Sequence, residues 1–161
     1  MAKKDKIPAT PALHALKGAG VAFTPRPYDY VPHGGTGEAA SQLNVDEHQV
    51  VKTLVMQDES GEPLLVLMHG DREVSTKNLA RQLGRKSVAP CAERDAQRYT
   101  GYQVGGISPF GIRRKMPVFV EKGILDLERV YINGGKRGLL VEISPTVLLK
   151  MLNPTPVEAA L

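Results

Sequence analysis

The segment from Thr100 to Pro117, TGYQVGGISPFGIRRKMP, has the composition of a ligand-binding loop but lacks the usual catalytic groups. Its four glycines allow backbone conformations and close approaches that other residues cannot make, and its two prolines restrict the turns between them. It contains no Asp, Glu, His or Cys. We therefore expect the loop to present backbone amides to a polar or negatively charged ligand, with Gly105 and Gly106 at its centre.

Lys52 is the second candidate for chemistry, because it lies inside the otherwise apolar run VVKTLV. If this run is a strand, side-chain alternation places Lys52 on the same face as Val50 and Leu54. A buried lysine is rare without an anionic partner or a lowered pKa. One reading is that Lys52 points into a cavity that holds a negative or polar ligand. The other is that the strand lies at a sheet edge, where the ammonium reaches water.

Basic residues form three local groups along the chain. If they converge in space they form an anion-binding rim, and if they do not, each is an ordinary solvated surface charge. The groups are Arg113, Arg114 and Lys115 directly after the glycine loop, Lys136 and Arg137 in a second glycine turn, and Lys77, Arg81, Arg85 and Lys86 on a predicted helix and its exit.

Several familiar motifs are absent or incomplete. GTGEAA lacks the preceding strand of a dinucleotide-binding unit, and GGKR lacks the upstream spacing and the hydroxyl residue of a phosphate-binding loop. The four histidines are scattered, so we expect no metal and no other cofactor. The lone Cys91 has no Cys or His at ligand spacing, which favours a small packed residue over a reactive thiol. No base is evident for Ser108, so its hydroxyl is expected to satisfy loop backbone groups.

The overall composition is that of one globular domain spanning 1–161. The chain has 161 residues, of which 42% are hydrophobic and 24% charged, and its net charge is +4. Its longest apolar runs have the length of strands, and its basic N-terminus lacks the apolar stretch of a signal peptide. These features predict no association with a membrane and a cytoplasmic location, which also suits the single cysteine.

The elements that must position these residues are short helices mixed with strands in hairpins. Because they show no regular βαβ alternation, we expect an α+β domain with a mixed, largely antiparallel, barrel-like sheet flanked by helices. Prolines demote one strand to a sheet edge, and a GG turn is expected within 129–144. The predicted helices are 10–20, 37–43, 75–84, 91–101 and 144–152, and the predicted strands are 21–30, 48–58, 63–70, 116–123 and two within 129–144.

Four segments together resemble a known family. VVKTLV, STKNLARQLG, TGYQVGGISPFG and VYINGGKRGLLVEIS are similar, in order and spacing, to segments of the YbaK family of bacterial aminoacyl-tRNA deacylases. These proteins are relatives of the editing domain inserted in prolyl-tRNA synthetases. The resemblance covers nearly the whole chain. It implies an α+β fold with a mixed, barrel-like sheet, misacylated tRNA as substrate, especially Cys-tRNA(Pro), and prolyl-tRNA synthetase as a candidate partner.

The resemblance also implies roles for individual residues. Lys52 matches the essential lysine of the family, and Gly105, with its neighbour Gly106, matches the loop glycine that faces the scissile ester. At two positions the chain departs from the best-known members: Asn133 replaces a serine and Leu140 an aspartate, and an aromatic residue expected near Gly35 is missing. These changes affect the pocket that would hold the acyl group. The residues expected to bind substrate are Tyr28, Thr53, Ser108, Pro109, Asn133 and Gly134.

Members of this family are thought to let the cysteine thiol of the substrate attack its own ester carbonyl. The protein would then supply orientation and an oxyanion site of backbone amides, a device worth about 3 kcal/mol per donor. Lys52 would hold the 3′-terminal nucleotide, while Arg113, Arg114, Lys115, Lys136 and Arg137 would hold the acceptor stem. Two alternatives stay open: a deacylase for another acyl group such as alanine, and a tRNA- or synthetase-binding module without catalysis.

Overall fold

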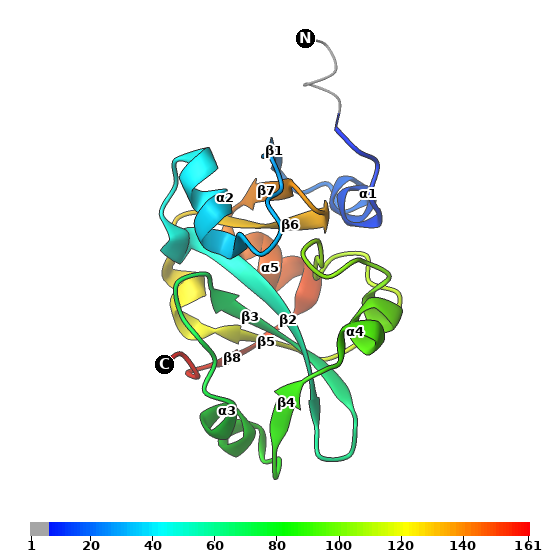
Figure 1. Cartoon of the computed structure of the whole chain (residues 1–161), viewed down its shortest axis with the longest axis vertical. Coiled ribbons are helices and arrows are strands. Elements are labelled where there is room, and N and C mark those ends of the chain that lie inside the picture. Colours follow the sequence, from blue (N-terminus) through cyan, green and yellow to red (C-terminus); the bar gives the residue numbers. More distant parts are fainter. Residues whose placement is uncertain (1–6) are drawn as a thin grey trace.

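The structure, a computed structural model, describes residues 7–161 as one sheet with helices on both faces (Figure 1). Every helix expected from the sequence is present. The helices are α1 (Pro11–Gly18), α2 (Gly35–Leu43), α3 (Thr76–Leu83), α4 (Glu93–Thr100) and α5 (Pro145–Leu152), with short 3-10 turns η2 (Glu47–Gln49) and η3 (Lys122–Asp126). The strands are β1 (Thr24–Pro27), β2 (Val50–Asp58), β3 (Pro63–His69), β4 (Val88–Pro90), β5 (Val118–Glu121), β6 (Val130–Lys136), β7 (Leu139–Ile143) and β8 (Thr155–Val157).

The strand order is β1-β7-β6-β2-β3-β5-β8, and β4 pairs with β2 outside this path. Four of the pairings are antiparallel, whereas β2 with β6, β3 with β5, and β5 with β8 are parallel. The predicted α+β class with a mixed sheet is therefore confirmed. The sheet is open, with β1 and β8 at its two ends, so it does not close into a barrel. The proline-rich β1 lies at an edge, as its missing N–H donors require.

The hairpin of β2 and β3 forms the centre of the sheet. Lys52 lies opposite Met68 in this hairpin, and β6 pairs with the first residues of β2, while β4 pairs with the last. β2 is thus an interior strand with neighbours on both sides. β2 is therefore not an edge strand, contrary to one reading of Lys52, although its pairings with β6 and β4 do not include residues 52–55.

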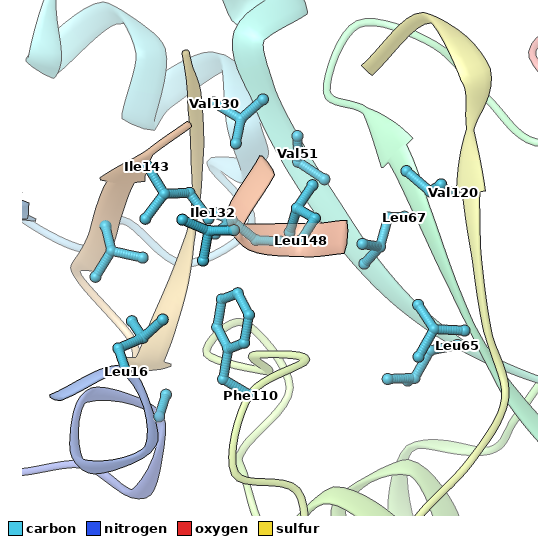
Figure 2. Close-up of a cluster of buried hydrophobic side chains, with 14 of the residues drawn as sticks. Leu16, Val51, Leu65, Leu67, Phe110, Val120, Val130, Ile132, Ile143 and Leu148 are labelled. Atoms are coloured by element: carbon cyan, nitrogen blue, oxygen red, sulfur yellow. The ribbon is translucent and has the colours of Figure 1, made fainter. Parts of the chain in front are cut away.

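The two faces of this hairpin are covered differently. Val51 and Val55 belong to the main core, which Leu16 of α1, Leu148 of α5 and Phe110 of the glycine loop complete (Figure 2). On the other face, α2 covers one end of the hairpin and α3 the other, each through its own small apolar cluster. Lys52 lies on this second face, between Val50 of the α2 cluster and Leu54 of the α3 cluster.

The hairpin of β6 and β7 differs from the prediction in one respect. The expected GG turn is instead a bulge, since the strand register shifts between Asn133 and Lys136. The chain reverses one step later, at Arg137 and Gly138, where Gly138 has φ +83°. The bulge forms because the Asn133 side-chain oxygen accepts hydrogen bonds from the backbone N–H groups of Gly135 (2.8 Å) and Lys136 (3.2 Å).

The helix boundaries follow from capping residues visible in the sequence. Thr10, Ser75 and Ser144 each accept a backbone N–H bond at the start of α1, α3 and α5. Gly84 ends α3 in the left-handed conformation, as expected. The sequence did not predict β4 and β8, because each has only three residues and contains a proline, VAP and TPV.

Candidate active site

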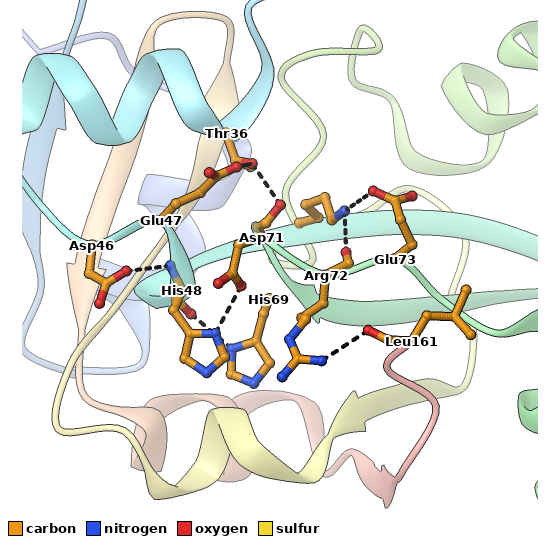
Figure 3. A network of polar contacts seen from close by, with 11 residues as sticks. Thr36, Asp46, Glu47, His48, His69, Asp71, Arg72, Glu73 and Leu161 are labelled. Carbon is orange, nitrogen blue, oxygen red and sulfur yellow. Dashed lines mark hydrogen bonds and ion pairs between the residues drawn. The ribbon is translucent and has the colours of Figure 1, made fainter.

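Lys52 lies between the two small apolar clusters of one sheet face and is held by a neighbouring turn. Its ammonium donates to the Arg72 carbonyl at 2.6 Å and pairs with the Glu73 carboxylate at 3.3 Å (Figure 3). The Lys52 side chain is 20% exposed, whereas that of Glu73 is 82% exposed. An ammonium has three donors, so these two acceptors leave one donor for a ligand. A phosphate would also compete well for the position of the solvated Glu73 carboxylate.

Asn133 lies on the strand next to β2 and contacts the glycine loop. The parallel pairing of β2 with β6 ends at Val51 and Ile132, and Lys52 and Asn133 are the residues that follow on each strand. The Asn133 amide nitrogen donates to the Gly105 carbonyl at 3.1 Å. The Asn133 side-chain oxygen already accepts the backbone N–H groups of Gly135 and Lys136 in the bulge. Asn133 is therefore placed to fix the loop against the β6–β7 hairpin.

The two central glycines of the loop have different roles. Gly105 is exposed with φ +96°, and no residue in the described range 7–161 accepts its N–H. Gly106 is buried, and its N–H donates to the Gln103 carbonyl at 2.8 Å. A Cβ on Gly106 would lie 2.7 Å from the Arg137 backbone nitrogen. Of this pair, Gly105 has the amide without an acceptor in the described range, whereas the Gly106 amide is bonded and Gly106 lets the loop pack on the hairpin. The catalytic roles of both glycines stay predictions.

Tyr30 and Arg137 lie next to Gly105. The hydroxyl oxygen of Tyr30 lies 3.0 Å from where a Cβ of Gly105 would be, and the Arg137 guanidinium lies over the Tyr30 ring, 5.2 Å from its centroid. Arg137 also donates from Nε to the Val104 carbonyl at 2.9 Å. Arg137 thus braces the loop and the tyrosine together, which occupies part of the guanidinium that was expected to hold RNA.

Tyr28 and Leu140 form the apolar end of the site. Both pack in the cluster beneath α2 with Val50 and Tyr131, and Leu140 is only 4% exposed. Burial is the main reason that the pKa of Tyr28 is raised, so its hydroxyl stays protonated at neutral pH. The aspartate expected by resemblance at position 140 is thus replaced by a buried hydrocarbon side chain. This end of the site favours an apolar or small group over a charged one.

Four residues predicted to bind substrate do not reach the open site. Thr53 follows Lys52 in the strand, so its side chain lies on the opposite face, where its hydroxyl oxygen is buried without a partner in the described range. Ser108 is fully buried, and its hydroxyl accepts the Phe110 N–H at 3.1 Å, as its loop role predicts. Pro109 and Gly134 are also buried. These residues support the loop and the bulge from behind.

The predicted acceptor-stem residues do not form one continuous rim. Lys136 is exposed beside the Gly105 and Gly106 segment. Arg113, Arg114 and Lys115 are exposed at the other end of the loop, where Arg114 pairs with Glu62 at 3.5 Å and lies over the Tyr99 ring. Their binding of tRNA remains a prediction.

Sequence reasoning missed three residues at this site. Tyr30, Arg72 and Glu73 contact Gly105 or Lys52, but each is far from its partner in sequence and carries no motif. The spacing of Tyr28 and Tyr30 in the segment YDY is the one available signal, since two aromatic residues two apart share a face of an extended segment.

Other reactive groups lie elsewhere. Burial, with the nearby Asp95 carboxylate second, raises the pKa of the Cys91 thiol, so it is not an activated nucleophile. Residues 7–161 hold no group of three or more His, Cys, Asp or Glu side chains arranged to bind a metal ion. None of the helices in this range has the length and apolar character needed to cross a membrane.

Comparison with known proteins places this geometry in a family. The aminoacyl-tRNA editing domain model matches residues 33–151. A protein of Enterococcus faecalis, EbsC, proposed to be a Cys-tRNA(Pro)/Cys-tRNA(Cys) deacylase, is 27% identical over 156 residues, covering 95% of this chain and 94% of EbsC. A proline–tRNA ligase of Streptococcus equi is 29% identical over 101 residues, which are 63% of this chain but 16% of the ligase.

The fold agrees with this match. A solved structure of a protein proposed to be a trans-editing enzyme for prolyl tRNA synthetase superposes with a TM-score of 0.84 at 21% identity, over 96% of this chain and 99% of the other. The matched range 33–151 contains Lys52, the glycine loop and the β6–β7 hairpin. The chain therefore belongs to the family of aminoacyl-tRNA editing domains.

Proposed function

We propose that this protein is a trans-acting deacylase that removes a wrong amino acid from tRNA, with Cys-tRNA(Pro) as its main substrate, in the cytoplasm. The observation that carries the proposal is that one editing-domain fold holds Lys52 on β2 and, through the paired strand β6, the glycine loop: Asn133 of β6 binds the Gly105 carbonyl, and the Gly105 amide has no acceptor within residues 7–161. An aminoacyl ester at the 3′ end of a tRNA presents a nucleotide phosphate and an ester carbonyl. A cation can bind the phosphate, and a free backbone amide can donate to the carbonyl oxygen.

In this mechanism Lys52 binds the phosphate of the terminal nucleotide and replaces its contact with Glu73. The ester carbonyl then lies against the Gly105 amide, which stabilises the oxyanion that forms during attack. The cysteine thiolate of the substrate forms a bond to the carbonyl carbon, and the bond from that carbon to the ribose oxygen breaks. The thiol proton passes to the ribose oxygen, so the products are a thiolactone and free tRNA. The protein contributes position and electrostatics, and no side chain acts as nucleophile.

The Enterococcus faecalis relative supports the cysteinyl substrate, since its name refers to Cys-tRNA deacylation and it matches over nearly the full length of both chains. The prolyl-tRNA ligases match only about a sixth of their length, in line with one editing module of a larger enzyme. Prolyl-tRNA synthetase is thus the partner that we propose to supply tRNA identity to this chain.

A second candidate substrate is Ala-tRNA(Pro). It is favoured by the buried Leu140 beside Tyr28, which makes the acyl end of the site apolar and removes the charge expected there. Alanine has no thiol, so this reaction needs a water molecule as the attacking group. Replacement of the expected aspartate by Leu140 would by itself discriminate only modestly between the cysteine and alanine side chains of the substrate.

A deacylation panel tests the proposal. Purified protein is incubated with tRNA(Pro) charged with cysteine, alanine, serine or proline, and release of the amino acid is followed with the product identified by mass. We expect rapid loss of the cysteinyl ester with thiolactone as the first product. Faster loss of the alanyl ester would establish the second candidate. Binding of charged tRNA without turnover of any ester would make the protein a non-catalytic binding module and overturn the proposal.

A further inference from the structure

A basic groove lies between α3 and β4, away from the residues assigned to the ester. Its lining residues are the cations Lys77, Arg81, Arg85 and Lys86 and the hydroxyl residues Thr76 and Ser87, with two small apolar residues at the base. Lys77 and Arg81 are one helical turn apart, so both side chains lie on the same side of α3. The sequence singled out these four cations as a group, and the structure brings them together in one concave surface.

The groove remains positive after its internal contacts are counted. Arg85 forms an ion pair with the buried Asp58 carboxylate. Burial alone would raise the pKa of Asp58, but hydrogen bonds from the backbone N–H groups of Glu62 and Ser60, together with Arg85, lower it overall. Glu59 accepts the backbone N–H groups of Lys86 and Ser87.

The other three cations keep their charge for a ligand. No ion pair within residues 7–161 involves Lys77, Arg81 or Lys86, and all three are exposed. Exposed cations without carboxylate partners, beside hydroxyl donors, suit an extended anion better than a single carboxylate.

This groove lies on the same side of the sheet as Lys52. Lys52, Leu54 and Met56 alternate along one face of β2, and α3 packs on that face through Leu79, which contacts the cluster containing Met56. β4 pairs with the last residues of β2, from Met56 to Asp58. At about 3.3 Å per residue, this part of β2 lies roughly 13–20 Å from Lys52. A nucleic acid strand that begins at Lys52 can therefore reach the groove.

We propose that the α3–β4 groove binds the sugar-phosphate backbone of the tRNA whose terminal nucleotide lies at Lys52. This inference rests on the proposed function and extends it to a second contact with the same substrate. Lysine, arginine and hydroxyl side chains without an aromatic platform bind phosphates and ribose rather than bases. The contact is thus independent of sequence. It supplies affinity at a distance from the ester, whereas the Gly105 loop handles the reacting group.

The test uses the triple variant Lys77→Ala, Arg81→Ala, Lys86→Ala, which leaves the Arg85 to Asp58 pair intact. Its control is Lys17→Ala, Lys122→Ala, Lys150→Ala, which removes the same charge from exposed positions. The control positions are on α1, η3 and α5, elements that pack on the opposite, main-core face. Binding of fluorescent uncharged tRNA(Pro) is measured by anisotropy from 50 to 300 mM salt, and circular dichroism checks that both variants are folded.

We expect the groove variant to lose at least tenfold in affinity for tRNA. The magnitude of the slope of log K against log salt concentration should fall by about 2, because each lost phosphate contact reduces that magnitude by roughly 0.7–0.9. The control should change the slope by less than half as much. Cleavage of a minimal cysteinyl-adenosine ester should be unchanged in the groove variant, since that substrate is too short to reach α3.

Two results would overturn the inference while leaving the proposed function standing. One is an unchanged salt slope in a groove variant whose wild-type parent deacylates Cys-tRNA(Pro). The other is an equal loss in the control, which would mean that net charge alone controls binding. If the wild-type protein cleaves none of the four esters but the slope still falls in the groove variant alone, the proposed deacylation fails and the RNA contact holds.

Discussion

Lys52 and Thr53 are adjacent in sequence, yet they belong to two different environments. Lys52 lies on the face of β2 that carries the two small clusters under α2 and α3, whereas Thr53 lies on the face closed by the main core. Within residues 7–161, the ammonium of Lys52 has two acceptors and partial access to water, while the hydroxyl of Thr53 is buried without a partner. The alternation of one strand thus separates the lysine that we propose to bind substrate from a threonine in the core.

The difference teaches how this small domain makes room for a site. One face is sealed by α1, α5 and the apolar residues of the glycine loop, which together provide most of the core. The other face needs only a small cluster under each end helix, so its middle can hold a lysine, an asparagine and an exposed glycine amide. Substitutions on the two faces should therefore separate activity from stability.

The largest effect is expected from Lys52→Ala. The variant should lose about 100-fold or more in kcat/KM for Cys-tRNA(Pro), roughly 2.7 kcal/mol of transition-state stabilisation, because the site loses its phosphate-binding cation. Its melting temperature should change little, since Glu73 is largely exposed and gains full hydration. Activity is measured on charged tRNA beside Lys122→Ala as a matched control. Turnover equal to wild type would remove Lys52 from the mechanism.

Gly105→Ala should give the next largest effect. Gly105 has φ +96°, and a Cβ there would lie 3.0 Å from the Tyr30 hydroxyl and 3.2 Å from Arg137 Nε. The loop amide must shift, and we expect kcat to fall about tenfold or more, as on removal of an oxyanion donor.

Gly61→Ala is the control for the backbone strain of that change, since Gly61 has φ +81° with no atom within 4 Å of the added Cβ. Both variants should lose about 1 kcal/mol of stability. Only the Gly105 variant should lose activity. Equal kcat values for the two would mean that the loop amide does not contact the ester.

Thr53→Val should affect stability alone, and in the favourable direction. The substitution replaces a buried hydroxyl that has no partner with a methyl group of similar shape, on a β-branched side chain suited to a strand. We expect a gain of about 1 kcal/mol, or roughly 2–4 °C in melting temperature. Deacylation should stay within about twofold of wild type. A large loss of activity with an intact fold would mean that Thr53 contacts substrate as first predicted, and that the two faces are not separate.

The smallest effect is expected from Cys91→Ser. The thiol is half-buried, its nearest polar contact is the Gln57 side-chain oxygen at 3.7 Å, and its raised pKa keeps it protonated at neutral pH. Both the rate and its pH profile should match wild type. A folded variant with a lost or displaced alkaline limb in its pH profile would show that a protein thiol takes part, contrary to the substrate-thiol mechanism.

The sequence by itself determined the elements and the identity of the key residues. Capping residues such as Ser75 and Gly84, apolar alternation, and prolines in β1 act within a few residues, so their outcome could be read locally. The unusual Lys52 and the glycine loop were likewise visible as local exceptions to the pattern. Short strands with proline, such as β4 and β8, were missed because tertiary pairing rather than propensity forms them.

Only the tertiary structure decided which of these residues share a site. The parallel pairing of β2 with β6 brings the strand of Lys52 next to the strand of Asn133, about 80 residues away in sequence, and no local signal encodes that register. The same packing uses up the Gly106 amide, buries Ser108, and turns Thr53 away from Lys52. Burial and hydrogen-bond partners depend on contacts distant in sequence, so residue type alone selected the candidates and the fold divided them between catalysis and support.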